Sequence, residues 1–184
     1  MKVSIIGLGY IGLPTACLIA SMGIETIGVD INKKVINSLK AGKCHIEEKG
    51  LNDILKSSLD NGKLKVSSNP EKSDIYVITV PTPTKNYLNK KEPDLSFIFS
   101  AIESIISIID NNSLIILEST SPIGTTNSLK DYLFSRSLSP FIAYCPERVL
   151  PGNIIYELKN NPRVVGGINY ESALRAPDHA WLRP

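Results

Sequence analysis

Three glycines near the amino terminus stand at a spacing that suits the binding of a phosphorylated ligand. Gly7, Gly9 and Gly12 follow a short apolar run, and a stretch with helical spacing of apolar residues comes after them. A second apolar run then ends in Asp30. This order of strand, glycine turn, helix, strand and terminal acid predicts a dinucleotide-binding βαβ unit. The alternative is a glycine-rich turn that binds no ligand.

Each residue of this pattern has a physical task. Gly7 permits the tight turn after the strand, Gly9 lets the main chain approach a pyrophosphate, and Gly12 lets the helix pack close to the strand. The N-terminus of the helix offers free N–H groups and the positive end of its dipole to the phosphates. A carboxylate at Asp30 accepts hydrogen bonds from both ribose hydroxyls and repels a 2′-phosphate. The pattern therefore predicts NAD rather than NADP as the cofactor.

Two threonines follow later apolar runs. Thr82 stands between two prolines after the run 75–80, and Thr120 lies in the hydroxyl-rich stretch 118–122 after another run. Ligands of open α/β sheets bind beyond the carboxyl ends of the strands, so both threonines are candidates for contact with a dinucleotide. The alternatives are a rigid loop at Thr82 and the capping of the next helix by the stretch 118–122.

A carboxylate and a guanidinium stand side by side after a further apolar run, 141–144. Glu147 could act as a base, and Arg148 could bind an anionic or carbonyl-bearing ligand. A surface ion pair between the two is the alternative. The three cysteines and two histidines have neither CxxC spacing nor a metal-ligand cluster, so no metal site is predicted.

The rest of the sequence predicts the elements that hold these residues in place. Apolar runs suited to buried strands alternate with segments of helical spacing, which predicts an α/β fold. We expect a Rossmann-type, doubly wound, mostly parallel sheet with helices on both faces. The helix after residue 94 carries an isoleucine-rich stripe that we interpret as core packing and not as a binding face. The polar stretch 85–93 is predicted to be a mobile loop, and 163–167 a short strand and turn.

The composition argues against several classes of protein. The chain has 184 residues, of which 42% are hydrophobic and 21% are charged, as in an ordinary globular domain. A net charge of +2 is too small to indicate a nucleic-acid partner. No apolar run is long enough to cross a membrane, so no membrane partner is predicted. Three cysteines and an immediate start on a strand, without a signal peptide, predict a cytoplasmic protein with reduced thiols.

Longer motifs keep their order and spacing over nearly the whole chain. They are GLGYIGLP (7–14), VDIN (29–32), VPTP (80–83), ESTSPIGTT (118–126), CPERVLPG (145–152) and RVVGGI (163–168). Together they resemble the NAD-dependent nucleotide-sugar 6-dehydrogenases, the family that includes the UDP-glucose and GDP-mannose enzymes. CPERVLPG is most similar to the branch that oxidises UDP-N-acetylmannosamine, and UDP-N-acetylglucosamine enzymes share much of it.

This resemblance implies a reaction and a set of residue roles. The C6 alcohol of a UDP-sugar is oxidised to a carboxylate in two NAD-dependent steps, the second through a cysteine thioester. A homodimer is implied for the full-length protein. The implied roles are cofactor contacts for Tyr10, Ile11, Asp30, Thr82 and Thr120, a base or water activator at Glu147, a water-positioning hydroxyl at Thr120, and substrate contacts for Arg148 and Val149.

The sequence also departs from the family pattern. Pro151 stands where the UDP-glucose enzymes have a second glutamate, and Val35 where they tend to have a basic residue. We expect an NAD-binding domain over residues 1–168, followed in 169–184 by the start of the family's next helix or by an aberrant tail. The central helix, the UDP-binding domain and the nucleophilic cysteine are expected to be absent. Cys145 is not that cysteine, because the family does not place it in CPER.

Four functions stay open at this point. The first is the UDP-N-acetylmannosamine enzyme fragment, which would bind NAD without turnover on its own. The second is a UDP-N-acetylglucosamine or UDP-glucose 6-dehydrogenase fragment, and the third is a non-catalytic NAD-binding module. The fourth is another dehydrogenase of the same fold, such as a hydroxy-acid enzyme, against which the CPERVLPG stretch argues.

Overall fold

Strands and helices largely alternate in the computed structural model, which describes residues 1–87 and 90–176. The strands are β1 (Lys2–Ile6), β2 (Glu25–Val29), β3 (Leu64–Ser67), β4 (Ile75–Ile78), β5 (Thr84–Tyr87), β6 (Lys90–Pro93), β7 (Leu114–Leu117), β8 (Phe141–Tyr144) and β9 (Gly166–Gly167). The helices are α1 (Gly12–Ser21), α2 (Lys33–Lys40), α3 (Leu51–Asp60), α4 (Ser96–Ile105), α5 (Thr125–Phe134), α6 (Ile154–Asn160) and α7 (Tyr170–Arg175).

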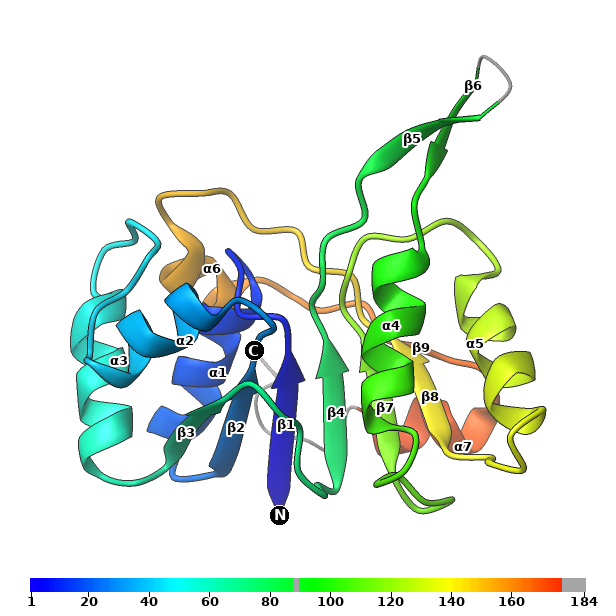
Figure 1. The fold of residues 1–184 in the computed structure, drawn as a ribbon, viewed down its shortest axis with the longest axis horizontal. Helices are drawn as coiled ribbons and strands as arrows, with labels where there is room; N and C mark the ends of the chain where they lie inside the picture. The colour runs from blue at the N-terminus through cyan, green and yellow to red at the C-terminus, as the bar shows by residue number, and fades with distance from the viewer. Residues whose placement is uncertain (88–89, 177–184) are drawn as a thin grey trace.

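Seven strands of the described residues form one sheet in the order β3-β2-β1-β4-β7-β8-β9 (Figure 1). Neighbouring strands are parallel except for β9, which runs antiparallel to β8. The chain builds outward from β1 in one direction and then returns to build outward from β4 in the other. β1 and β4 therefore flank the switch point, beyond which ligands bind in open α/β sheets. The predicted Rossmann-type, mostly parallel sheet is confirmed.

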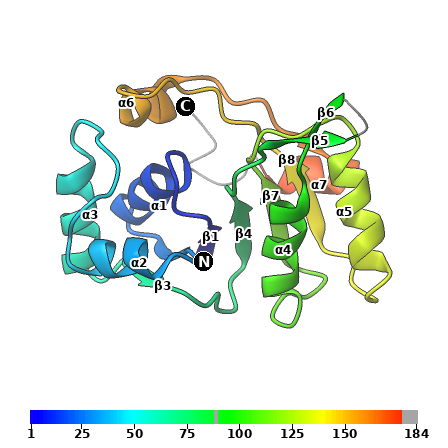
Figure 2. The ribbon, with the colours of Figure 1, turned by 45° about the horizontal axis from the view of Figure 1, so that its top comes forward.

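Each face of the sheet has its own hydrophobic core, because successive side chains of a strand point to opposite faces. Val77 and Ile116 pack with the buried residues of α1, α2 and α3. Their neighbours Tyr76 and Ile115 pack instead with those of α4 and α5. Burial on both faces explains why the strands are nearly continuous apolar runs. In Figure 2 the chain leading to α6 and the chain returning from it both cross the same end of the sheet.

The turn after β1 is tight because two glycines allow segments of main chain to approach each other. Gly7 has a φ angle of 101°, which favours glycine, and its N–H donates to the carbonyl of Val29 at 2.8 Å. A Cβ atom on Gly12 would lie 1.8 Å from the carbonyl oxygen of Gly7. The helix α1 therefore begins in direct contact with the end of β1, and residues 12–20 are all buried.

The polar stretch 85–93 is not the loop that its composition predicts. It forms most of a two-stranded antiparallel hairpin, β5 with β6, and residues 88–89 lie outside the described part. The N–H of Asp94 donates to the carbonyl of Pro83 at 2.6 Å and closes the base of the hairpin. Figure 1 shows it projecting from the body of the molecule. The prediction was wrong because a hairpin whose sequence is mostly polar lacks the alternation that reveals strands in a sequence.

The last described helix, α7, packs on β8 and β9. The N–H of Ile142 donates to Ser172 Oγ at 3.2 Å, and the Arg175 guanidinium lies 3.7 Å from the centroid of the Phe141 ring. The domain boundary at residue 168 stays a prediction, and residues 177–184 lie outside the described part of the chain. In the part that is described, no helix is both long and apolar enough to cross a membrane.

Replacing Gly12 by alanine is expected to destabilise the fold strongly, because the added methyl group would overlap the main-chain oxygen of Gly7. The free energy of unfolding should fall by about 3 kcal/mol or more, as measured by urea denaturation followed by circular dichroism. Gly9→Ala is the matched control, since nothing lies within 4 Å of a Cβ atom there. Its free energy of unfolding should change by less than about 1 kcal/mol. Equal losses in the two variants would contradict this account of the turn.

Candidate active site

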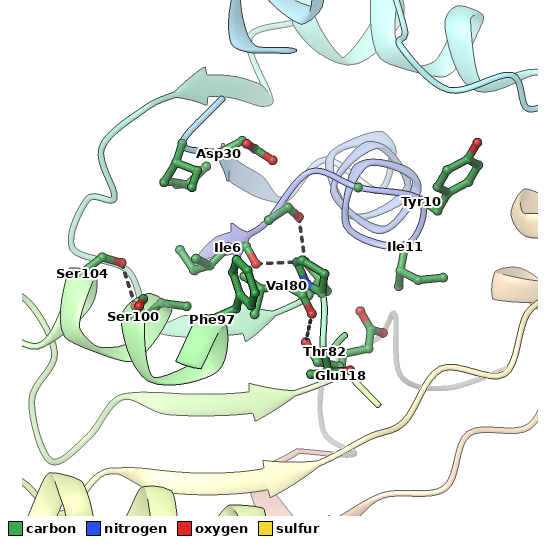
Figure 3. A pocket seen from close by; sticks show the side chains of 18 of the residues that line it. Ile6, Tyr10, Ile11, Asp30, Val80, Thr82, Phe97, Ser100, Ser104 and Glu118 are labelled. Atoms are coloured by element: carbon green, nitrogen blue, oxygen red, sulfur yellow. Dashed lines mark hydrogen bonds between the residues drawn. The ribbon is translucent and has the colours of Figure 1, made fainter. Parts of the chain in front are cut away.

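A cavity of about 750 Å³ opens at the carboxyl ends of β1, β2, β4 and β7. Its volume is typical of cofactor and small-molecule sites. In the view of Figure 3, Asp30 and Ser104 lie on one side of the cavity, and Thr82 and Glu118 on the other. Of the residues predicted for the site, those that line the cavity are Gly7, Gly9, Tyr10, Ile11, Asp30, Thr82, Thr120, Glu147 and Val149, whereas Gly12 and Arg148 do not.

The N-terminus of α1 borders this cavity, and the N–H of Leu13 there donates to the carbonyl of Gly9 at 3.1 Å. Among the described residues, no side chain caps the helix at Ile11, and its first turn contains no acidic residue. The position of a Cβ atom on Gly9 has no neighbour within 4 Å, so the main chain there faces open space. A phosphate group in that space would meet free N–H groups and the positive end of the helix dipole.

Asp30 is held beside the glycine turn by two main-chain hydrogen bonds. Its Oδ2 accepts from the N–H of Leu8 at 2.9 Å, and its Oδ1 accepts from the N–H of Asn32 at 2.8 Å. Each carboxylate oxygen can accept a second hydrogen bond, so both oxygens remain available to ligand hydroxyls. The acid that follows β2 is thereby fixed next to the turn that follows β1, in the wall of the cavity.

The helix α4 contributes a wall that the sequence analysis did not predict. Its isoleucines, such as Ile98 and Ile102, are buried in the core, as expected from the stripe. Phe97, Ser100 and Ser104 lie on another side of the same helix and line the cavity. The serines are four residues apart, which places them on one face of a helix. That spacing was the available signal, and the stronger isoleucine stripe obscured it.

The loops after β4 and β7 are tied together at the Glu118 side of the cavity. Thr82 Oγ1 donates to the carbonyl of Thr120 at 2.7 Å, and Ser119 Oγ donates to the carbonyl of Val80 at 2.7 Å. The hydroxyl hydrogen of Thr82 is thus used within the protein, but its oxygen can still accept a hydrogen bond from a ligand. The two predicted threonines therefore lie together, as their positions after neighbouring strands imply.

Three charged side chains meet at this side of the cavity. Arg163 Nη1 donates to Glu118 Oε1 at 2.7 Å, and Arg163 Nη2 lies 3.0 Å from Glu147 Oε2. Burial raises the pKa of Glu118 to about 7, while the Arg163 charge and hydrogen bond act in the opposite direction. We call Glu118, Glu147 and Arg163 the ion cluster. Sequence analysis identified only Glu147, because no local pattern connects residues this far apart in the chain.

The residues after Glu147 point in different directions. Val149 lines the cavity, whereas Arg148 is exposed and its Nη2 donates to the carbonyl of Pro162 at 2.6 Å. The expected alternative of a Glu147–Arg148 surface pair is not what forms, since Glu147 pairs with Arg163. The contact of Arg148 with a substrate stays a prediction.

Glu48 fastens the segment that follows this motif. Its Oε2 accepts from the N–H of Gly152 and its Oε1 from the N–H of Ile154, both at 2.9 Å. The carboxylate thereby satisfies main-chain donors at the start of α6. The segment that carries Glu147 and Val149 is thus held at its far end by a residue from the first third of the chain.

All three cysteines lie outside the cavity wall. Cys17 and Cys145 are buried, and Cys44 is partly buried. Burial raises the pKa of Cys17 to about 12 and also raises the pKa values of Cys44 and Cys145. Because the thiolate is the reactive form, thiols with raised pKa values are poor nucleophiles.

Comparison with known proteins identifies the family. The model described as UDP-glucose/GDP-mannose dehydrogenase family, NAD binding domain, matches residues 1–179. The chain belongs to this family. The matched part is its NAD-binding domain, so the cofactor predicted from the glycine turn and Asp30 is confirmed. The open space at Gly9, the uncapped helix and the fixed carboxylate all suit such a cofactor.

Several relatives in this family are longer than the chain. It is 45% identical over 177 residues to the UDP-N-acetyl-D-mannosamine dehydrogenase of Methanocaldococcus jannaschii, a match that covers 96% of this chain and 41% of the relative. The enzyme of that name from Campylobacter jejuni is 44% identical over 184 residues, covering 94% and 45%. The solved UDP-N-acetyl-mannosamine dehydrogenase of Staphylococcus aureus is 37% identical with a TM-score of 0.91, covering 98% and 45%. The chain thus spans less than half the length of these relatives.

Gly9→Ala is expected to weaken NAD binding while the fold persists, because the methyl group would occupy the space next to the uncapped helix. We expect a dissociation constant at least about tenfold higher, measured by isothermal titration calorimetry. Gly166→Ala is the matched control, since nothing lies within 4 Å of a Cβ atom there and Gly166 does not line the cavity. Unchanged affinity in Gly9→Ala would show that the cofactor does not approach this main chain.

Proposed function

We propose that this chain is the NAD-binding half of a nucleotide-sugar 6-dehydrogenase that oxidises UDP-N-acetylmannosamine to UDP-N-acetylmannosaminuronate. The observation that carries the proposal is the cavity itself, which joins Asp30 and the glycine turn on one side to Glu147 and Thr120 on the other. The choice of sugar is supported by the identities of 45% and 44% to dehydrogenases named for UDP-N-acetyl-D-mannosamine.

The Glu118 side of the cavity suits the oxidation of an alcohol. When bound, NAD supplies the acceptor for the hydride that leaves C6. Loss of that hydride requires removal of the alcohol proton, and Glu147 is the base that takes it. In the later hydrolysis of the cysteine thioester, Glu147 activates a water molecule that Thr120 orients. Tyr10, Ile11 and Thr82 border the cofactor, and Arg148 and Val149 contact the sugar nucleotide.

Related sugars form the second candidate. The NDP-N-acetyl-D-galactosaminuronic acid dehydrogenase of Ralstonia nicotianae is 42% identical over 178 residues. Its identity is close to those of the mannosamine enzymes, which makes its sugar the second candidate. UDP-glucose is supported less well, because the solved UDP-glucose dehydrogenase of Pyrobaculum islandicum is 26% identical.

Two further features stay predictions. A homodimer of the longer protein rests on the family resemblance. A cytoplasmic location is supported by the three free thiols, Cys17, Cys44 and Cys145.

The substrate is tested with the longer protein that carries this domain, by following the absorbance of reduced nicotinamide. UDP-N-acetylmannosamine should be oxidised faster than UDP-N-acetylglucosamine or UDP-glucose. The 184-residue chain alone is expected to show no steady turnover, because no cysteine lines its cavity. Steady turnover by the chain alone would contradict this expectation. If the longer protein oxidises no UDP-sugar, the proposed function is refuted.

The chain should bind NAD at least about tenfold more tightly than NADP, because the Asp30 carboxylate repels a 2′-phosphate. Asp30→Asn removes the charge with little change in shape, so the ratio of the dissociation constants for NADP and NAD should move toward one. Asp53→Asn, an exposed acid on α3 that does not line the cavity, is the control and should leave the ratio unchanged. Both ratios are measured by calorimetric titration. An unchanged ratio in Asp30→Asn would mean that this carboxylate does not select the cofactor.

A further inference from the structure

Arg163 is shared by two carboxylates from different parts of the chain. Its Nη1 pairs with Glu118 at 2.7 Å and its Nη2 with Glu147 at 3.0 Å, so each arm of the guanidinium serves one acid. Glu118 directly follows β7, Glu147 follows β8, and Arg163 precedes β9. The other oxygen of Glu147 accepts from the N–H of Arg148 at 2.6 Å. One oxygen of Glu147 is therefore hydrogen-bonded to the main chain, and the other is ion-paired with Arg163 without a hydrogen bond.

The ion cluster has one positive charge for two acids. Its side chains are 9% (Arg163), 2% (Glu118) and 9% (Glu147) exposed, so water screens these charges weakly. A second buried negative charge beside one cation is costly, and a proton on one carboxyl group removes that cost. Within the described residues, neither Oε2 of Glu118 nor Oε2 of Glu147 accepts a hydrogen bond. Glu118 is the more buried acid, and only Glu147 also accepts a main-chain N–H, that of Arg148, which favours its charged form. Glu118 is thus the acid that gains most from carrying the proton.

Cys145 also faces the ion cluster, but it does not change the balance of one positive charge against two acids. Cys145 Sγ lies 3.9 Å from Arg163 Nη1, and burial raises the pKa of this thiol, so it stays uncharged near neutral pH. Burial would lower the pKa of Arg163, but the charges of Glu118 and Glu147 outweigh it and raise that pKa further. The guanidinium therefore remains charged while Glu118, whose pKa is raised to about 7 mainly by burial, gains and loses its proton.

We propose that Arg163 is a positioning residue for Glu147, and that Glu118 sets how firmly Arg163 holds it by gaining or losing one proton. With a proton on Glu118, the charge of Arg163 is balanced by Glu147 alone. Without it, the same guanidinium is divided between two carboxylates. The proton exchanges with solvent through the cavity, which both acids line. The inference rests on the proposed function only where it treats Glu147 as the base.

A passive ion cluster that merely ties three segments together is the competing explanation. It would stabilise the fold, but the state of one acid would have no effect on the other. The chain offers a comparison, since Arg136 and Glu103 form an ion pair at 3.4 Å in which both side chains are about half exposed. That pair lies outside the cavity wall. It provides a control for changes that any lost ion pair would cause.

The first test is carboxyl carbon NMR on the 184-residue chain, free of ligand, from about pH 5 to about pH 9. One glutamate signal should titrate near pH 7 and should be missing in Glu118→Gln. The signal of Glu147, assigned from Glu147→Gln, should shift over the same pH interval. No glutamate titrating above about pH 6, or one that persists in Glu118→Gln, would overturn the role of Glu118.

Arg163→Lys tests the positioning role, because lysine keeps the charge but cannot reach two carboxylates with a planar fork. In this variant the Glu147 signal should no longer follow the titration of Glu118. Arg136→Lys, the control, should leave both signals as in the wild type. If the Glu147 signal follows Glu118 equally in Arg163→Lys, then Arg163 is not the link between the two acids.

Thermal unfolding gives a measurement that does not depend on signal assignment. The folded pKa of Glu118 lies above its unfolded value, so the protonated acid favours the folded state at low pH and this contribution is lost as pH rises toward 7. The melting temperature of the wild type should therefore fall further between about pH 5 and about pH 8 than that of Glu118→Gln. Equal losses would overturn the titration of Glu118.

These measurements require no turnover, so their failure is distinct from failure of the proposed function. In the longer protein, Arg163→Lys should lower kcat about tenfold or more, with a change in KM for the UDP-sugar of less than about threefold. If Glu118 titrates in a protein that oxidises no UDP-sugar, the inference about the ion cluster is supported and the proposed function is refuted. An unchanged kcat in Arg163→Lys would refute the positioning role of Arg163 but would not contradict the proposed function.

Discussion

The close contact between the start of α1 and the end of β1 is the constraint on which the rest of the site depends. A Cβ atom on Gly12 would lie 1.8 Å from the carbonyl oxygen of Gly7, so only glycine permits this approach. Thr79, after β4, donates to the same oxygen at 2.7 Å and fixes the turn from the other side. Because the helix starts there, its N-terminus stays at the edge of the sheet where Asp30 follows β2. Three strands thus define the region that receives the phosphates.

Much of the fold and the cofactor side of the cavity could be predicted because their determinants are local. Strands buried on both faces must be apolar at almost every position, as in 75–78 and 114–117, and such runs are visible in any sequence. The glycine turn and Asp30 lie within the first 30 residues, so their spacing alone indicates a βαβ unit. The sequence of the β5–β6 hairpin is mostly polar, and for that reason it predicts a loop.

The other side of the cavity could not be predicted, because long-range packing determines it. Glu118 and Arg163 are 45 positions apart and are brought together by the pairing of β7 with β8 and of β8 with β9. Ser100 and Ser104 belong to a helix whose buried isoleucines dominate its pattern, although one helix can place one face in a core and another on a cavity. The direction of Arg148 depends on the carbonyl of Pro162, which no local pattern reveals.

The attachment of Glu48 to the start of α6 has a consequence for synthesis on the ribosome. Its partners, the N–H groups of Gly152 and Ile154, follow it by 104 and 106 positions. At ~5–20 residues per second, roughly 5–20 s pass between the appearance of Glu48 and that of its partners. During that interval the segment that bears Glu147 cannot yet be anchored. On a nascent chain the segment that bears Glu147 can therefore be anchored to Glu48 only after residue 154 has been added, so this anchor is among the late contacts of the domain.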